Sequence, residues 1–436
     1  MESSTELVNK LRHLVEESCI LQGDQVSAYT YDSIVPEVVV LPASVQEMQN
    51  VLQFASAHDY TVMPAGAGTK LGVGNLPPKT DIVLATTHLN SVVEYEPADL
   101  TVTVEAGIRL ADLQTDLAKH RQFFPLNPPY GNRCTIGGIV ATNASGPLRL
   151  QYGTARNLVL GMHVVHANGT VVKSGGKVVK NVAGYDLNKL YIGAFGTLGI
   201  ITEVTLKLAP LPARQAIVAA QFQNVQDAVN TGLCIVSSQT LPTFVNLCTN
   251  LCIDQFSDRK PTLIVGFGGD SDTVTWQLNS AQSLVEQNGA LGVQIIEGES
   301  QESISHFIQE FSTVDKATDT ATVKVNLKRT DIAEFAEIAL EVTDKMMALL
   351  GNGVLYLKIT SDSDTDLQEL ANTLTELRQN AVDAGGNLII EAAPPELKRQ
   401  IDVWGSIGST LNLMKQVKAK FDGGSVLNPG RFVSGI

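Results

Sequence analysis

A glycine-rich stretch over residues 134–202 constrains the fold more than any other part of this sequence. It opens with CTIGGIVATNASGPLRLQYG, passes through GGKVVKNVAGYDL and closes with GAFGTLGIIT. Ile, Val and Leu stand between the glycines, so the stretch is packed structure and not a flexible linker. Paired glycines such as Gly137 and Gly138 lack a Cβ, which lets a backbone approach a flat or phosphorylated ligand. We therefore expect a buried organic cofactor along this backbone.

The length and charge of the chain exclude several classes of protein. With 436 residues the chain is long enough for two or three domains, each with its own core. Its net charge of −14 argues against a nucleic-acid partner, because phosphate binding requires clustered Lys and Arg. No uncharged apolar run reaches the 18 residues of a membrane span, and the acidic amphipathic start is unlike a secretory signal.

The cysteines indicate a reducing compartment. There are five, scattered along the chain, which fits reduced cytoplasmic thiols better than disulfides. Only Cys248 and Cys252 lie close in sequence, and one pair lacks the four thiolates that an iron–sulfur cluster or a structural zinc requires. We expect them to line a core, and we expect no metal site.

A second glycine-rich segment follows an early strand. Residues 37–41 read as a strand, Ser44-x-x-Glu47 starts a helix, and a strand at 61–63 leads into PAGAGTKLGVG at 64–74. Such a loop can cradle a phosphate with its backbone N–H groups. It has neither the Walker spacing nor a Rossmann fingerprint. From these residues alone, an ordinary glycine-rich surface loop is an equal alternative.

The remaining pattern indicates one compact first half and a strand–helix second half. Further strands are expected at 81–85 and 101–105, a helix at 109–119, and a hairpin around Asn168-Gly169. A long strand from 200 ends before Pro210. The second half alternates between strands and helices and predicts a sheet with helices on one face. Its strands are expected at 217–222, 243–247, 263–266, 322–327, 354–359 and 388–391, and its helices from 224, around 276–284, at 331–350 and from 367.

Taken together, these motifs resemble the PCMH-type FAD-binding domain of the vanillyl-alcohol oxidase family. PAGAGTKLGVG resembles the pyrophosphate loop of that family, and the two later glycine segments resemble those that enclose FAD. The chain is most similar there to glycolate and D-lactate dehydrogenases. GGKVVKNVAGYDL together with LNPGRF at 427–432 resembles the FAD-binding E-subunit of bacterial glycolate dehydrogenase.

The resemblance implies an α+β fold. A PCMH-type FAD-binding domain of two α/β subdomains would occupy residues 1–210, with a boundary near Pro210 to Pro212. An α/β cap domain with an antiparallel sheet would occupy 211–418, and residues 419–436 would return to the FAD site. The implied FAD-binding residues are Pro64, Gly66, Ala67, Gly68, Thr69, Thr135, Gly137, Gly138, Gly146, Gly153, Ile200, Ile201 and Asn428.

The same resemblance implies that FAD is held without a covalent bond. Relatives that attach the flavin covalently use a His in the pyrophosphate loop, where this chain has Thr69. Cys134 is offset by one position from the cysteine of doubly linked flavoproteins, and we interpret it as a small buried residue.

Catalytic residues cannot be assigned from the sequence. Catalytic relatives that resemble this chain carry an HGDGNLH-like motif in the cap, often with a metal, and this chain has none. His306 reads as a helix-face residue and not as a base. Asp186, Lys177 and Lys180 are interpreted as supports of the flavin loop. Four cations of the cap could bind a carboxylate, although cations on strands and loops are usually just solvated: Lys324, Lys328, Arg329 and Lys358.

Three hypotheses follow. In the first, the chain is an FAD-binding subunit of a glycolate dehydrogenase-like complex that oxidises glycolate or D-lactate. It would work beside a catalytic flavin subunit and pass electrons toward an iron–sulfur subunit. In the second, it is a self-sufficient FAD-dependent 2-hydroxy-acid dehydrogenase whose cap uses Lys and Arg. In the third, it is a non-catalytic scaffold that has lost the flavin. We expect a cytoplasmic location, with membrane association through partners left open.

Overall fold

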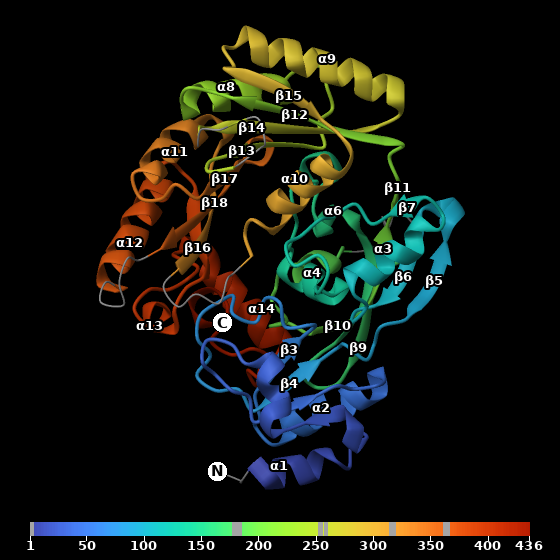
Figure 1. Cartoon of the computed structure of the whole chain (residues 1–436). Coiled ribbons are helices and arrows are strands. Elements are labelled where there is room, and N and C mark those ends of the chain that lie inside the picture. The colour runs from blue at the N-terminus through green and yellow to red at the C-terminus, as the bar shows by residue number, and fades with distance from the viewer. Residues whose placement is uncertain (1–3, 177–184, 252–255, 257–259, 314–319, 361–366) are drawn as a thin grey trace.

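The computed structural model describes residues 4–176, 185–251, 256, 260–313, 320–360 and 367–436. Within these residues, three main sheets form two small α/β subdomains and a larger cap, as predicted (Figure 1). The N-terminus lies at the outer end of the first subdomain, and the C-terminus lies between the first subdomain and the cap. No helix in the described part of the chain combines the length and apolar character needed to span a membrane.

The first subdomain is a four-stranded sheet in the order β1-β2-β4-β3, in which β2, β4 and β3 run parallel. The predicted helix start is confirmed: Ser44 Oγ accepts a hydrogen bond from the N–H of Glu47 at 3.2 Å, at the start of α2, while the Glu47 carboxylate accepts the N–H of Ala43. Val51 and Leu52 on that helix are fully buried against the sheet. The elements are β1 Ile20–Leu21, β2 Val38–Val40, β3 Val62–Ala65, β4 Ile82–Ala85, α1 Ser4–Leu11 and α2 Val45–Ala57.

The second subdomain is an antiparallel sheet in the order β5-β6-β10-β8-β9. The hairpin predicted at Asn168-Gly169 is confirmed, because it joins β8 to β9 and Gly169 has a φ of +79°. The elements are β5 Val92–Glu96, β6 Thr101–Glu105, β8 Val159–Val165, β9 Val171–Gly175, β10 Ile200–Lys207, α3 Leu110–Ala118, α4 Ile136–Thr142, α5 Arg149–Tyr152, α6 Ala155–Leu158 and α7 Asn188–Tyr191, with β7 Gln122–Phe123 paired to β11 Ala209–Pro210. Lys177 and Lys180 lie outside the described residues, as does Cys252.

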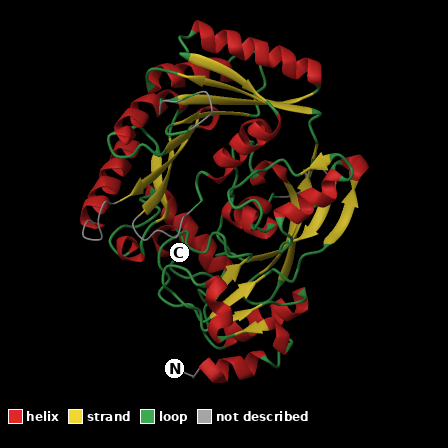
Figure 2. Ribbon diagram, viewed as in Figure 1, coloured by secondary structure: helices red, strands yellow, loops and turns green. Residues whose placement is uncertain are grey.

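The cap is built on one eight-stranded antiparallel sheet in the order β15-β12-β14-β13-β17-β18-β16-β19. Four helices, α8, α9, α11 and α12, pack on its outer face and form the largest hydrophobic core, while α10 packs on the other face (Figure 2). The strands are β12 Arg214–Gln221, β13 Phe244–Cys248, β14 Thr262–Gly269, β15 Gly292–Ile296, β16 Thr320–Asn326, β17 Met346–Leu349, β18 Val354–Thr360 and β19 Asn387–Ala392. The helices are α8 Val225–Val236, α9 Ser271–Gln287, α10 Gly298–Glu310, α11 Ile332–Leu340 and α12 Leu367–Asp383.

Two predictions for the cap are wrong. The helix expected over 331–350 ends at Leu340, and the apolar run that follows forms β17, a central strand between β13 and β18. A short apolar run has no periodicity that separates a buried strand from a buried helix, and only its sheet partners decide. The helices also do not all lie on one face, because α10 covers the inner one.

The C-terminal part of the chain packs against the first two subdomains. After α13 Pro395–Lys398, helix α14 Leu411–Phe421 packs on the second subdomain through Phe421, which contacts the rings of His166 and Tyr191. The segment beyond α14 runs beside β3, where the N–H of Val62 donates to Val426 O at 2.7 Å. A domain boundary at residue 418 would therefore fall inside α14.

Candidate cofactor and substrate site

A cavity lies between the two subdomains. Its walls come from segments distant in sequence: the loop after β3, the start of α4, the start of β10 and the C-terminal segment. Each of these is a place where the chain enters or leaves a regular element. Loops held by rigid elements at such positions are common places for ligand sites.

The loop after β3 offers backbone donors to the cavity. The N–H groups of residues 66–69 donate no hydrogen bond to any other described residue, and Gly68 has a φ of +76°. A Cβ on Gly66 would lie 2.1 Å from Thr135 Oγ1, so no larger residue fits there without displacing its neighbour. A concave row of unpaired N–H groups is suited to a phosphate or diphosphate.

Helix α4 begins at the opposite wall. Thr135 caps it, accepting a hydrogen bond from the N–H of Gly138 at 3.3 Å through Oγ1. A Cβ on Gly137 would lie 2.7 Å from Ala106 Cβ, so this glycine allows α4 to pack closely on the end of β6. The glycine pair thus serves packing on one side and access to the cavity on the other.

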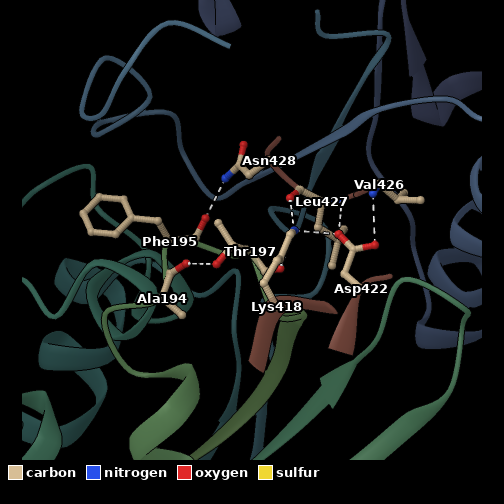
Figure 3. A network of polar contacts seen from close by, with 8 residues as sticks. All are labelled: Ala194, Phe195, Thr197, Lys418, Asp422, Val426, Leu427 and Asn428. Carbon is tan, nitrogen blue, oxygen red and sulfur yellow. Dashed lines mark hydrogen bonds and ion pairs between the residues drawn. The ribbon is translucent and has the colours of Figure 1, made fainter. Parts of the chain in front are cut away.

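The C-terminal segment closes the cavity through Asn428. This residue has a φ of +48°, and its Nδ2 donates to Phe195 O at 2.6 Å, while its Oδ1 is buried without a hydrogen-bond partner among the described residues (Figure 3). A buried acceptor without a partner carries a desolvation cost that a ligand donor would remove. Asn428 can thus contact a bound molecule directly, and Arg431 of the same segment also lines the cavity.

A buried ion pair holds that segment in place. Lys418 Nζ lies 2.6 Å from Asp422 Oδ2 and donates to Thr197 O at 2.9 Å and Leu427 O at 2.8 Å (Figure 3). The Asp422 carboxylate also accepts the N–H groups of Val426 and Leu427. Because both charges are paired and hydrogen-bonded, this network fixes residues 422–428 against the second subdomain.

Most residues predicted to bind the cofactor line this cavity. They are Pro64, Gly66, Ala67, Gly68, Thr69, Thr135, Gly137, Gly138, Ile200, Ile201 and Asn428. Gly146 and Gly153 lie elsewhere. A Cβ on Gly146 would lie 1.7 Å from Asn127 O, and Gly153 ends α5 with a φ of +84°. These two glycines are required by the packing of the neighbouring loops. Their position in the motif could not show whether they serve loop packing or contact with a ligand.

Thr69 and Cys134 both lie on the cavity wall, but neither provides a nucleophile for a flavin. The Cys134 side chain is buried, and burial raises the pKa of its thiol to about 12. A thiol in that state stays protonated at neutral pH and is unreactive.

A second, smaller cavity adjoins the first, and of its charged residues Lys324 alone was among the candidate cations considered from the sequence. Lys70, Lys324, Tyr356 and Glu391 contribute to its wall. Lys70 belongs to the loop after β3, and the other three belong to the cap sheet. One feature of the sequence pointed to this cavity: Lys324 lies within the alternating segment TATVKVN. A lysine at that position indicates that one face of this central strand is polar.

Of the four cap cations considered from the sequence, Lys324 alone lies in this second cavity. Lys328 and Arg329 are exposed, and Lys358 lies over the ring of Phe311, 5.9 Å from its centre. His306 is exposed on α10, as expected of a helix-face residue, and Asp186 is exposed near Lys189. Among the described residues, no group of His, Cys, Asp and Glu is arranged to hold a metal ion.

Comparison with known sequences agrees with a two-part flavoprotein. The family described as "FAD binding domain" matches residues 36–175, and the family described as "FAD linked oxidases, C-terminal domain" matches residues 211–432. The unpaired N–H groups, the close glycines and the free Asn428 Oδ1 are features that suit the diphosphate and polar ring edge of such a cofactor.

Several relatives match most of the chain. The chain is 28% identical to glycolate oxidase subunit GlcD of Bacillus subtilis, over 92% of this chain and 91% of the relative. It is 25% identical to D-2-hydroxyglutarate dehydrogenase of Stutzerimonas stutzeri, over 98% of each. It is 28% identical to a probable mitochondrial D-lactate dehydrogenase of Danio rerio, over 91% of this chain and 84% of the relative.

Solved structures share the fold. Alkyldihydroxyacetonephosphate synthase superposes with a TM-score of 0.77 at 18% identity, over 99% of this chain and 86% of that one. Substrate-bound p-cresol methylhydroxylase superposes with a TM-score of 0.77 at 16% identity, over 98% of this chain and 96% of that one.

Proposed function

This chain belongs to the FAD-linked oxidases, and from that premise we propose that it is an FAD-binding subunit of a 2-hydroxy-acid dehydrogenase complex. Glycolate or D-lactate is the proposed substrate of the complex, and an iron–sulfur subunit is the proposed next electron carrier. Relatives that match nearly the whole chain support the substrate class, since their names specify a glycolate oxidase subunit and D-2-hydroxy-acid dehydrogenases. The complex would also include a catalytic flavin subunit and work in the cytoplasm.

The observation that carries the flavoprotein role is the cavity between the subdomains with its unpaired N–H groups. Residues 66–69 would hold the diphosphate, and Thr135 would keep the start of α4 in place beside it. Asn428 Oδ1 would accept a hydrogen bond from the cofactor. The flavin, when bound, supplies an acceptor for the hydride on the carbon that bears the substrate hydroxyl.

The residues of the cavity wall indicate that FAD is held without a covalent bond. Thr69 stands where covalently linked relatives have a His, and the Cys134 thiol stays protonated because burial raises its pKa to about 12. Acid precipitation should therefore release the whole flavin into the supernatant. Flavin absorbance that stays with the precipitated chain would contradict this expectation.

The proposed function is tested on the purified chain and on a native extract. The chain should take up one FAD, and affinity purification from its source should recover an iron–sulfur protein with it. If the chain shows no flavin absorbance after incubation with FAD, both the subunit hypothesis and the self-sufficient dehydrogenase hypothesis are wrong. Only the scaffold hypothesis would then remain. A flavin-loaded chain that is recovered alone from its source would overturn the complex.

The self-sufficient dehydrogenase remains the second candidate because of one observation, the charged cavity around Lys324 that adjoins the larger one. Anaerobic mixing of the flavin-loaded chain with glycolate or D-lactate separates the two. Rapid bleaching of the flavin by the isolated chain would favour self-sufficiency, whereas bleaching only in the presence of the catalytic subunit would favour the complex.

A further inference from the structure

Buried cations hold the second half of the cofactor loop, the segment 66–75 that follows β3. Three consecutive carbonyls of that segment accept hydrogen bonds from them: Leu71, Gly72 and Val73. Arg431 Nη2 donates to the first and the third, and Lys398 Nζ donates to the second. No backbone N–H in the described part of the chain donates to these carbonyls. The conformation of this half therefore depends on side chains from the C-terminal part of the chain.

Lys398 is placed by a carboxylate of the first subdomain. Its Nζ lies 2.7 Å from Asp32 Oδ1, and the two side chains are only 1% and 6% exposed. Asp32 occupies a tight turn with a φ of +46°, closed by reciprocal backbone hydrogen bonds between Tyr31 and Ile34 at 3.2 and 2.6 Å. The ion pair thus links three parts of the fold, namely this turn, the cofactor loop and α13.

Arg431 reaches the cofactor loop from near the end of the chain. Its guanidinium lies over the ring of Tyr31, with Cζ 4.9 Å from the ring centre. Its carbonyl accepts the N–H of Asn75 at 3.0 Å. The Asn75 side chain in turn donates to Asp402 Oδ2 and accepts the N–H of Val403, each at 2.9 Å. The backbone and the side chain of this loop residue are therefore both bonded to the C-terminal part of the chain.

The cluster contributes little to stability by itself. It buries two cations with one carboxylate, and Asp32 Oδ2 and Arg431 Nη1 have no hydrogen-bond partner among the described residues. Burial lowers the pKa of Lys398, and Asp32 opposes this shift. Buried charges of this kind often stabilise a fold less than apolar residues of similar volume. Their clear effect is geometric, because hydrogen bonds from charged donors are strong and fix the direction of the carbonyls.

The clamped half of the loop is bonded to the half that faces the cavity. The N–H of Leu71 donates to Gly68 O at 3.3 Å, and the N–H of Val73 donates to Lys70 O at 3.1 Å. Residues 66–69 carry the unpaired N–H groups. A change in the clamped half would therefore move the groups that are suited to a diphosphate.

We propose that Lys398 is a positioning residue for the cofactor: it fixes the Gly72 carbonyl and so holds the N–H groups of residues 66–69 in place. In the described part of the chain, Lys398 is not one of the residues that form the walls of the two cavities, so it acts through the loop. Arg431 supports the same loop but also lines the larger cavity, which makes Lys398 the cleaner test. The inference rests on the proposed function for the identity of the ligand, and it makes FAD affinity depend on α13.

Fluorescence titration with FAD and amide exchange test the inference on the full chain. Lys398→Met keeps the length of the side chain and removes its charge. FAD affinity should fall at least about tenfold, as expected when one charge-assisted hydrogen bond no longer holds the loop. In the chain without FAD, mass spectrometry of a peptide that covers the loop should show exchange of the Leu71 and Val73 N–H groups at least about tenfold faster than in the parent.

Controls separate the position of the loop from charge and from stability. Arg399→Met removes the neighbouring cation, which is exposed and pairs with Glu396 at 3.1 Å, and should leave FAD affinity within about twofold of the parent. Leu278→Ala opens a cavity in the outer core of the cap, so it should lower the melting temperature and also leave FAD affinity within about twofold. If Lys398→Met does not fold, the double variant with Asp32→Asn removes both buried charges and replaces it, with the same expected results.

Unchanged FAD affinity or unchanged loop exchange in Lys398→Met would overturn the inference. An equal loss of FAD affinity in Leu278→Ala would also overturn it, because the effect would then follow stability alone. If the parent takes up no FAD while Lys398→Met still accelerates loop exchange, the proposed function is wrong and the clamp on the loop stands.

Discussion

Replacing Lys418 by methionine should unfasten the C-terminal segment. In the folded chain, Lys418 donates to two backbone carbonyls and pairs with Asp422, whose side chain is 1% exposed. Methionine fills the space but leaves a buried carboxylate without a cation and both carbonyls without a donor. The two N–H groups that Asp422 still accepts soften the loss. Breaking such a pair costs about 3–5 kcal/mol, so we expect a loss of about 4 kcal/mol.

Tryptophan fluorescence can report on the C-terminal segment separately from the rest of the chain. Trp404 lies 5.1 Å from the Phe432 ring centre, and its Nε1 donates to Arg431 O at 2.9 Å. The chain has two tryptophans, so in a Trp276→Phe background Trp404 fluorescence follows the release of the C-terminal segment in urea. FAD should also bind more weakly to Lys418→Met, because Asn428 would no longer be held at the cavity.

Two further variants decide whether the ion pair is the cause. Lys418→Met with Asp422→Asn removes the uncompensated charge and should recover at least about 1 kcal/mol relative to the single variant. Lys415→Met, on an exposed position of the same helix, should stay within about 0.5 kcal/mol of the parent. A loss under about 1 kcal/mol for Lys418→Met, or no recovery in the double variant, would refute the reasoning.

Three other predictions follow from the cavity and its neighbours. Gly66→Ala places a Cβ 2.1 Å from a threonine oxygen and should weaken FAD binding at least about tenfold in a fluorescence titration, whereas Gly424→Ala, whose nearest neighbour would be 3.6 Å away, should not. Iodoacetamide should label the exposed Cys234 and spare Cys134 up to about pH 10, because the Cys134 pKa is about 12 and its thiolate forms only above that range; mass spectrometry that finds rapid Cys134 labelling at pH 8 would contradict this. Glu310→Ala removes the acceptor of two backbone N–H groups that ties α10 to the loop before α4, at 2.8 and 3.1 Å, and should lower the unfolding free energy by about 2 kcal/mol in urea titrations; an unchanged midpoint would show that this clamp is unimportant.

The cofactor cavity was the most predictable part of the molecule. Glycine is the residue that permits a positive φ or an approach closer than a Cβ allows, so its positions in PAGAG and TIGG mark the backbone that must stay accessible. Gly66, Gly68 and Gly137 do meet such demands. The same logic failed to place Gly146, because a glycine needed for loop packing looks the same in sequence as one needed for a ligand.

Capping and hairpin signals were also readable, since both ends of each interaction lie within a few residues. Ser44 and Glu47 share one helix start, and Asn168-Gly169 joins adjacent strands. The run at 346–349 carried no such local signal. Its strand state depends on partners on β13 and β18, and only the assembled sheet provides them.

The sequence by itself determined where a backbone must stay accessible, because glycine positions depend on local backbone geometry, and its resemblance to the PCMH-type family specified FAD as the cofactor. Only the tertiary structure decided which charged side chains lie beside the cofactor cavity. Lys324 was one of several cap cations, and Lys70 and Glu391 are separated by most of the chain. Their meeting depends on how a loop of the first subdomain packs against the inner face of the cap sheet. No short-range pattern records such a contact, because its free energy comes from burial shared between distant segments.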